Sequence, residues 1–332
     1  MIDACEMIAA KASLRRAVFI RSQQENPAIN GGDEQMLLSI NHNIPRLKSR
    51  GSSRLIFFLI LLIFFPHKSQ GYQWQELSSE HFIIYFLENK DFAQEVLDKA
   101  EVYYRNIALQ LGYPRYSEFW TWKNRVKIYI YPDRDSFQKA TGQPTWSEGM
   151  ASYNDKQIMS YAWSKGFTES LLPHEMAHLI FRDFVRFKGA IPLWLDEGVA
   201  QWMEEPKRPQ IKRIAKKYFQ ESSFLCVEDM MRLDIRNLKY AEAVYIRPTR
   251  TKEGGDGILF LSAELLINTY YIESVSLVGF LIEKYGSSAF ADFCRELRDG
   301  KNVEEALRSA YPAHIRNLRE FEDRWREYLE AE

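Results

Sequence analysis

The pattern of apolar and polar positions divides the chain into three parts. Residues 1–71 contain one unbroken apolar run, whereas 72–167 switch between strand-like and helix-like spacing. From residue 168 to 332 the spacing of apolar positions is helical almost throughout. The strands therefore precede most of the helices instead of alternating with them. This order predicts an α+β fold, with a mixed sheet in 72–167 and a helical part in 168–332.

Individual elements follow from the same spacing. Residues 125–132 alternate strictly, which places Val126, Ile128 and Ile130 on one face of a strand. The other expected elements are a strand at 81–86, helices at 92–111 and 134–142, hairpin arms at 150–155 and 157–163, and helices at 170–187, 194–205, 211–219, 273–285, 289–298, 303–310 and 315–330. Ser170 is the expected N-cap of the first of these later helices. Residues 247–257 are polar and glycine-rich and predict a mobile loop.

The apolar run at 55–65 is typical of an export signal. It reads LIFFLILLIFF and follows a basic segment, and it is shorter than the roughly 20 apolar residues that a bilayer span needs. Ser69 and Gly71 suit the −3 and −1 positions of a cleavage site, which predicts a mature chain that begins at Tyr72. The alternative is an uncleaved anchor that holds the protein to the membrane through 55–65. Either way, the expected location is the periplasm, the medium or the outer face of the membrane.

The remainder of the leader is long for a signal peptide, which normally spans about 15–30 residues. A start at Met36 would give an n-region of ordinary length, so we expect translation to begin there and not at Met1. Residues 1–71 are thus treated as a leader, and 72–332 as the functional domain.

Charge and cysteine content exclude some classes of function. The formal net charge is −1. This argues against a general nucleic-acid binder, because such a protein needs a clear basic excess to neutralise phosphates. Cys226 and Cys294 lack the spacing of a metal site. They are equally compatible with one disulfide in an exported protein and with two buried thiols.

The candidate chemistry lies in the segment LLPHEMAHLIF at 171–181. His174 and His178 are four residues apart, so on a helix they project from one face and can bind a single Zn²⁺. Glu175 is adjacent to the first histidine, where it can act as general base for a water molecule that zinc activates.

A third ligand is expected from the following helix. Residues 179–196, eighteen in all, separate His178 from Glu197, which lets the first helix end and a second return antiparallel. Glu197 would then face both histidines and complete a two-histidine, one-glutamate zinc site. Asp196 is the expected acceptor for the other ring nitrogen of a ligand histidine.

These residues resemble a known family. HEMAH, the eighteen-residue gap and the glutamate of WLDEG are similar to the gluzincin metallopeptidases, with the spacing of the aminopeptidase-type members. The stretches KIYIYPDRDSFQKATG, PTWSEGMA, YYIESVSLVGFLIEKYG and EFEDRWREYL resemble the peptidase-MA-like exported hydrolases of bacteria. The resemblance covers most of 72–332. It implies a thermolysin- or aminopeptidase-like zincin fold, one Zn²⁺ between the two parts, and a peptide or protein substrate.

The resemblance also points to substrate-binding positions. Tyr271 matches a tyrosine that stabilises the oxyanion in such enzymes, although a packing role for Tyr271 or the adjacent Tyr270 is an equal alternative. Gly149, Met150 and Ala151 match the strand that pairs with the substrate backbone. That strand reads GMASYND and lacks the glutamate with which aminopeptidases hold a free amine. Aminopeptidase activity is therefore not implied.

Together these features predict an exported zinc-dependent metallohydrolase, and specifically a peptidase. The alternative is a catalytically silent zinc-containing protein that binds partners or serves as an envelope scaffold, which suits the aromatic-rich helical tail. The presence of Glu175 favours the enzyme, because zinc binding alone does not need a general base.

Overall fold

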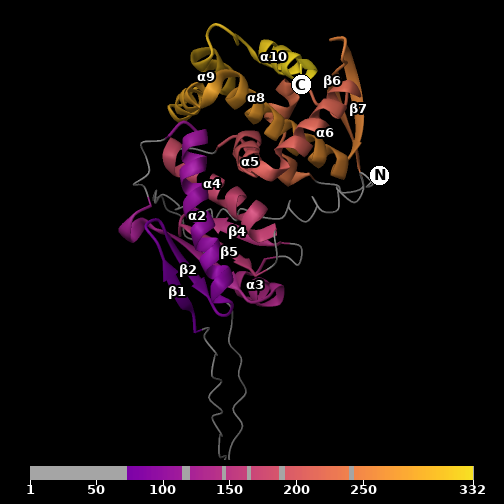
Figure 1. The fold of residues 1–332 in the computed structure, drawn as a ribbon. Coiled ribbons are helices and arrows are strands. Elements are labelled where there is room, and N and C mark those ends of the chain that lie inside the picture. Colours follow the sequence, from indigo (N-terminus) through magenta and orange to yellow (C-terminus); the bar gives the residue numbers. More distant parts are fainter. Residues whose placement is uncertain are drawn as a thin grey trace, which may run out of the picture. The chain divides into compact units, whose positions relative to one another are not determined.

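The computed structural model describes residues 73–113, 120–143, 147–162, 166–186, 191–238 and 243–331 (Figure 1). The leader at 1–71 lies outside the described residues, and so do the apolar run at 55–65 and its predicted roles in export and anchoring.

The N-terminal part is built on a five-stranded mixed sheet with the order β1-β2-β3-β5-β4. The strands are β1 (Gln75–Ser78), β2 (Phe82–Phe86), β3 (Val126–Tyr131), β4 (Gly149–Ser152) and β5 (Gln157–Tyr161). The three central strands β2, β3 and β5 are parallel, and the two edge strands are antiparallel to their neighbours. The predicted strands and the predicted hairpin of β4 and β5 are confirmed.

One face of this sheet forms part of the main core. Ile84, Ile128 and Ile158 lie side by side on β2, β3 and β5, and all three side chains are fully buried. Successive side chains of a strand point to opposite sides of the sheet, so the apolar residues at alternate positions of these strands share this face. Helix α2 (Lys90–Gln110) packs against β2 on this face and also contacts α4 (Leu172–Val185), as Figure 1 shows.

The C-terminal part is mainly helical, as the sequence predicts. Its helices are α4, α5 (Leu193–Trp202), α6 (Arg208–Gln220), α7 (Val227–Arg232), α8 (Ala263–Arg298), α9 (Val303–Ala310) and α10 (Leu318–Ala331). Helix α3 (Arg134–Thr141) belongs to the N-terminal part. Short 3-10 turns lie at Trp122–Asn124, Glu205–Lys207 and Ile235–Asn237. The predicted α+β class, with a mixed sheet followed by helices, is therefore confirmed.

Helix α8 combines two predicted helices and begins earlier than expected. The backbone of Gly286, with φ of 85°, breaks it between the segments expected at 273–285 and 289–298. Its first residue is ten positions before residue 273, because Ser262 caps the helix by accepting a hydrogen bond from the amide of Leu265. α8 is long and apolar enough to span a membrane, but 78% of its most apolar window is buried within the fold.

The predicted mobile loop at 247–257 is wrong. This region belongs to an antiparallel hairpin of β6 (Val244–Arg250) and β7 (Asp256–Ser262), and only residues 251–255 connect the two strands. The polar, glycine-rich turn hid the strands, because the apolar runs that flank it, at 244–246 and 258–261, do not alternate with polar residues.

The two cysteines of the domain are both free thiols. Cys294 is fully buried in the core, and Cys226 is partly exposed. Of the two alternatives that the sequence left open, the structure therefore contains the thiols and not the disulfide.

Helices α5 and α8 cross at very short range, and Gly198 makes this possible. A Cβ atom on Gly198 would lie 2.6 Å from the carbonyl oxygen of Ser274 and 2.8 Å from a methyl group of Val278. Such distances are shorter than van der Waals contact, and the nearest atom belongs to a helix backbone that cannot rotate away. The position of α5 over α8 thus depends on the absence of a side chain at residue 198.

Replacement of Gly198 by alanine should therefore destabilise the fold, despite the better helix propensity of alanine. We expect Gly198→Ala to lower the free energy of unfolding by about 1–3 kcal/mol, as overpacking does in other cores. Gly255→Ala is a matched control, because a Cβ there would meet its nearest neighbour at 3.4 Å. Urea denaturation of both variants measures the difference, and equal stabilities would contradict the role given to Gly198.

Candidate metal centre

Helix α4 places the two histidines of HEMAH on one buried face. Pro173, which has no backbone N–H, is the second residue of α4 and follows a π-helical turn. His174 and His178 are one helical turn apart, and their ring centroids are separated by 4.9 Å. Both side chains are almost fully buried, so the helix presents two imidazoles toward the interior and not toward bulk water.

Helix α5 supplies the third group of the predicted ligand set. One ligand atom each from His174, His178 and Glu197 lies within 4.8 Å of the other two. Nε2 of His174 is 4.0 Å from a carboxylate oxygen of Glu197. Ligand atoms around a tetrahedral zinc lie about 3.3–3.6 Å apart, so a shift of about 1 Å would close the three around one ion. These residues could therefore hold a metal ion.

Asp196 orients the second histidine, as the sequence predicts. Its carboxylate lies 3.0 Å from Nδ1 of His178 and also accepts a 2.5 Å hydrogen bond from Arg182. Burial acts to lower the pKa of His178, but the charge and hydrogen bond of Asp196 outweigh it and raise this pKa to about 9. Burial likewise opposes ionisation of Asp196, but His178 and Arg182 lower its pKa to about 2.

Glu204 has the corresponding role for the first histidine, and the sequence analysis missed it. A carboxylate oxygen of Glu204 lies 3.0 Å from Nδ1 of His174, and the other accepts hydrogen bonds from Ser170 and Lys207. Lys207 also donates to the hydroxyl of Ser170 over 2.6 Å. Despite burial, the hydrogen bond from His174 and the charge of Lys207 hold the pKa of Glu204 below its usual value.

Ser170 itself is therefore not the N-cap that the sequence predicts. It lies in a π-helical turn, Phe167–Leu171, which precedes α4, and the helix has no side-chain cap. Its hydroxyl binds Glu204 instead. The sequence holds one sign of this role, because the basic Lys207 follows three residues after Glu204. Only the fold shows that the carboxylate of Glu204 is buried beside His174.

Glu175 differs from the other buried acids at this site. Only 1% of the residue is exposed, and no hydrogen-bond partner of its Oε1 is found among the described residues. Burial raises the pKa of Glu175, and the charges of Glu197 and Glu204 add to this effect against the two histidines. A buried, unpaired carboxylate oxygen is suited to accept a proton from a molecule that enters the site.

The neighbouring tyrosines lie in different environments on α8. Tyr270 is 1% exposed, and burial together with the charge of Glu197 raises the pKa of its hydroxyl. Tyr271 is half-buried, and its ring meets that of Tyr270 edge-on at 6.2 Å. It lies inside α8 and not in a segment before a helix. The catalytic role of Tyr271 remains a prediction, and the charge of Glu197 acts on the hydroxyl of Tyr270.

The edge strand β4 carries the three predicted substrate-binding residues. Gly149, Met150 and Ala151 are all buried, and β4 packs against α4. Within the described part of the chain, β4 pairs only with β5, so the backbone on its other side has no strand partner. This edge lies beside the helix that carries the histidines.

Comparison with known proteins adds no assignment. No family model matches the chain, and no curated protein matches it. The interpretation of the site consequently depends on the HEMAH motif and on the geometry of α4 and α5.

Removal of the Glu204 carboxylate should weaken metal binding. Glu204→Gln keeps the size of the side chain but loses the charge that orients His174, so we expect the dissociation constant for Zn²⁺ to rise by about 10–100-fold. Glu205→Gln is the control, because the side chain of Glu205 is half-exposed and bonds Gln110, away from the histidines. A competition titration with a chromophoric chelator measures both, and an unchanged affinity in Glu204→Gln would contradict the assignment.

Metal affinity should also depend on pH. Below about pH 9 His178 carries a proton in the metal-free chain, and an ion must displace it. The affinity for Zn²⁺ should therefore rise with pH, by about tenfold per unit for one displaced proton, and level off above this pKa. Asp196→Asn should move the transition to lower pH, because it removes the charge that raises the pKa of His178. The same chelator competition at a series of pH values tests this, and a flat profile would refute it.

Proposed function

We propose that the chain is an exported zinc-dependent metallohydrolase of the gluzincin type, and specifically a peptidase. The observation that carries the proposal is the combination of two kinds of group in one buried site. His174, His178 and Glu197 bring three possible ligand atoms together, and Glu175 adds a carboxylate oxygen for which the described residues offer no hydrogen-bond partner. Zinc binding by these three ligands does not itself need a general base, which is the role that Glu175 would fill.

The donor set fits zinc in a catalytic role. Two imidazoles and one carboxylate are the ligands of known zinc peptidases, whereas structural zinc sites usually close with four protein ligands. Asp196 and Glu204 lie within hydrogen-bond distance of the Nδ1 atoms of the two histidines, which leaves Nε2 of each ring to hold an ion. When bound, the ion would supply a Lewis acid and lower the pKa of a water molecule.

The residues of the chain would perform the proton transfers. Glu175 would take a proton from the attacking water, and its raised pKa makes it a stronger base than an exposed carboxylate. The same carboxyl group would then deliver the proton to the departing amine. Tyr271, or the neighbouring Tyr270, would donate a hydrogen bond to the oxyanion.

Substrate recognition would use the free edge of the sheet. An extended peptide can add to β4 through backbone hydrogen bonds, next to Gly149, Met150 and Ala151. Such binding depends on the peptide backbone and suits a peptide or protein substrate. The mixed sheet, the position of α4 beside β4 and the ligands on α4 and α5 support a zincin-like arrangement of the two parts.

Export is part of the proposal and depends on the leader. The apolar run at 55–65, with its basic flank, would direct the chain across the membrane as a signal peptide or hold it there as an anchor.

The decisive variant is Glu175→Gln. It removes the base but leaves the three ligands, so the protein should still bind about one Zn²⁺ while hydrolysis falls at least about 100-fold. Cleavage of a peptide library by the purified protein, with a chelator control, measures activity, and elemental analysis measures zinc.

A matched carboxyl-to-amide change provides the control. Glu169→Gln lies on an exposed position five residues before His174 and should retain full activity. Full activity in Glu175→Gln would refute the mechanism, and zinc without any cleavage by the wild type would favour a silent binding protein.

A further inference from the structure

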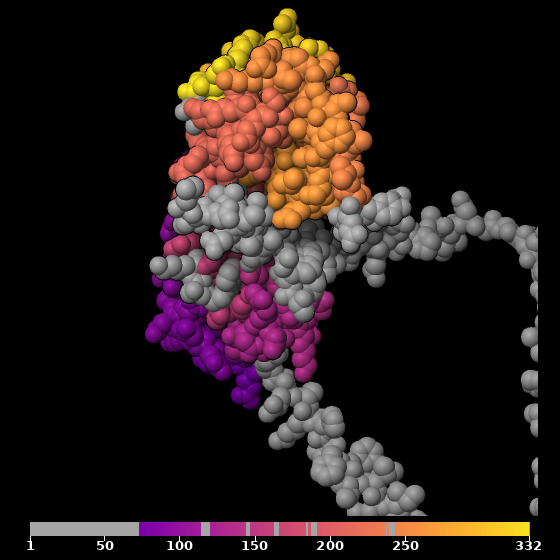
Figure 2. Space-filling view, turned by 90° about the vertical axis from the view of Figure 1, so that its right-hand side faces the viewer, coloured from indigo at the N-terminus to yellow at the C-terminus, as the bar shows by residue number. Residues whose placement is uncertain are grey.

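The hairpin of β6 and β7 has an apolar face that is open to solvent. Val244, Ile246, Ile258 and Phe260 project from it and are 66%, 62%, 64% and 68% exposed. Alternate positions along both strands are exposed, so these side chains share one face. Leu265, at the start of α8, is also exposed beside them. Figure 2 views the molecule from the side on which the hairpin lies, where its surface is orange.

The opposite face of the hairpin is fixed to the protein. The hydroxyl of Thr249 donates a hydrogen bond to the carbonyl of Phe224, and the amide of Cys226 donates to the carbonyl of Pro248 over 3.0 Å. Leu261 is buried in the main core. The inner face therefore has its own contacts, and the apolar outer face cannot fold onto the domain.

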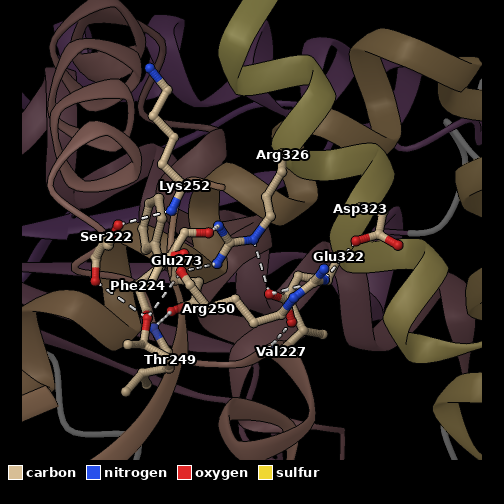
Figure 3. Close-up of polar contacts among 12 residues, drawn as sticks. Ser222, Phe224, Val227, Thr249, Arg250, Lys252, Glu273, Glu322, Asp323 and Arg326 are labelled. Atoms are coloured by element: carbon tan, nitrogen blue, oxygen red, sulfur yellow. Dashed lines mark hydrogen bonds and ion pairs between the residues drawn. The ribbon is translucent and has the colours of Figure 1, made fainter. Parts of the chain in front are cut away.

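Helix α10 holds the turn end of the hairpin, as Figure 3 shows. Arg326 donates hydrogen bonds to the backbone carbonyls of Arg250 and Thr251, at 2.8 and 3.2 Å. The side chain of Arg250 in turn binds Asp323 at 2.6 Å and lies 3.6 Å from Glu322. Charged hydrogen bonds to backbone carbonyls of this kind restrict motion of the turn. The outer face is thus displayed by a preorganised support.

The register of the hairpin makes this face suited to a twofold contact. Ile246 lies directly opposite Phe260, and Pro248 lies opposite Ile258. A twofold axis along the strands would place Phe260 of each copy against Ile246 of the other. Two sheets packed in this way lie about 10 Å apart and interdigitate their side chains.

The size of the face agrees with such a contact. The exposed side chains together offer on the order of 500 Å² of apolar surface, near the upper end of the patches that monomers expose. A standard interface buries about 800 Å² on each partner around an apolar centre. The hairpin would supply that centre, and the surrounding polar surface would supply the rim.

The charges around the face do not favour an anionic membrane. Arg247 and Arg250 point inward, to Asp229 and Asp323, and leave Lys252 beside Glu253 and Asp256 at the turn. An interfacial membrane binder carries an excess of lysine and arginine around its apolar residues. The turn instead has a slight negative balance, which a protein surface tolerates.

We propose that the outer face of the β6–β7 hairpin is the surface through which two copies of this chain associate. This association does not depend on the proposed hydrolysis, because none of the residues of the face belongs to the metal centre.

Site-specific cross-linking tests the contact in cells that express the full chain. In a Cys5→Ser, Cys226→Ala background, Ile246→Cys should give a product of twice the chain mass with a short bismaleimide reagent. Leu109→Cys is the matched control, because Leu109 is 61% exposed on α2, outside the face. The natural Cys294 is fully buried and can stay. A product with a different protein, or no product above the control, would overturn the proposal.

Sedimentation of the purified full-length protein tests the energetics. Phe260→Lys should raise the dissociation constant of the dimer at least about tenfold, as loss of a central aromatic residue does in other interfaces. Leu109→Lys should leave it unchanged, and thermal unfolding confirms that both variants are folded. A monomeric wild type, equal dissociation constants in the two variants, or binding of the wild type to anionic vesicles through Phe260 in place of dimers would each refute the contact.

Discussion

Four carboxylates lie in one small buried region, and their charge is the constraint around which the rest is arranged. Asp196 is compensated by His178 and Arg182, and Glu204 by His174 and Lys207. Among the described residues Glu197 has only the 4.0 Å contact with His174, Oε1 of Glu175 has no hydrogen-bond partner, and burial raises the pKa of both carboxyl groups. Buried ions are costly unless an opposite charge is close. A divalent cation between the histidines and Glu197 would balance this deficit of positive charge.

The polar contacts around the histidines link the helices α4 and α5. Ser170 precedes α4, and Glu204 and Lys207 follow α5, so one network joins the start of the first helix to the end of the second. α5 is in turn fixed to α8 by the close approach at Gly198. Tyr270 on α8 is close enough to Glu197 to be affected by its charge. The site is therefore supported from three helices and not from α4 alone.

The sequence was informative wherever the signal is local. The strict alternation in β3 and the apolar spacing of α9 predicted these elements, and HEMAH with Glu197 predicted three groups that the fold brings together. Chain spacing was sufficient here, because α4 and α5 are consecutive and pack against each other.

The failures have different causes, and only for Glu204 is the cause distance along the chain. Glu204 lies thirty residues after His174, and its contact depends on where α5 ends. The hairpin at 244–262 was hidden because its strands do not alternate between apolar and polar residues and flank a turn that is typical of a loop. The early start of α8 depends on the cap at Ser262, which is also the last residue of β7. Without the strand β7, the sequence does not identify Ser262 as the cap.

The contact at Gly198 gives α8 control over the spacing of the ligands. Val278 touches α5 next to Glu197 without being part of the metal centre. A larger side chain at position 278 would push α5, and with it the carboxylate of Glu197, relative to the two imidazoles. Metals differ in the bond lengths and coordination numbers that they accept. Selection could thus change the metal preference of the site through a residue that does not contact the ion, while His174, His178 and Glu197 stay unchanged.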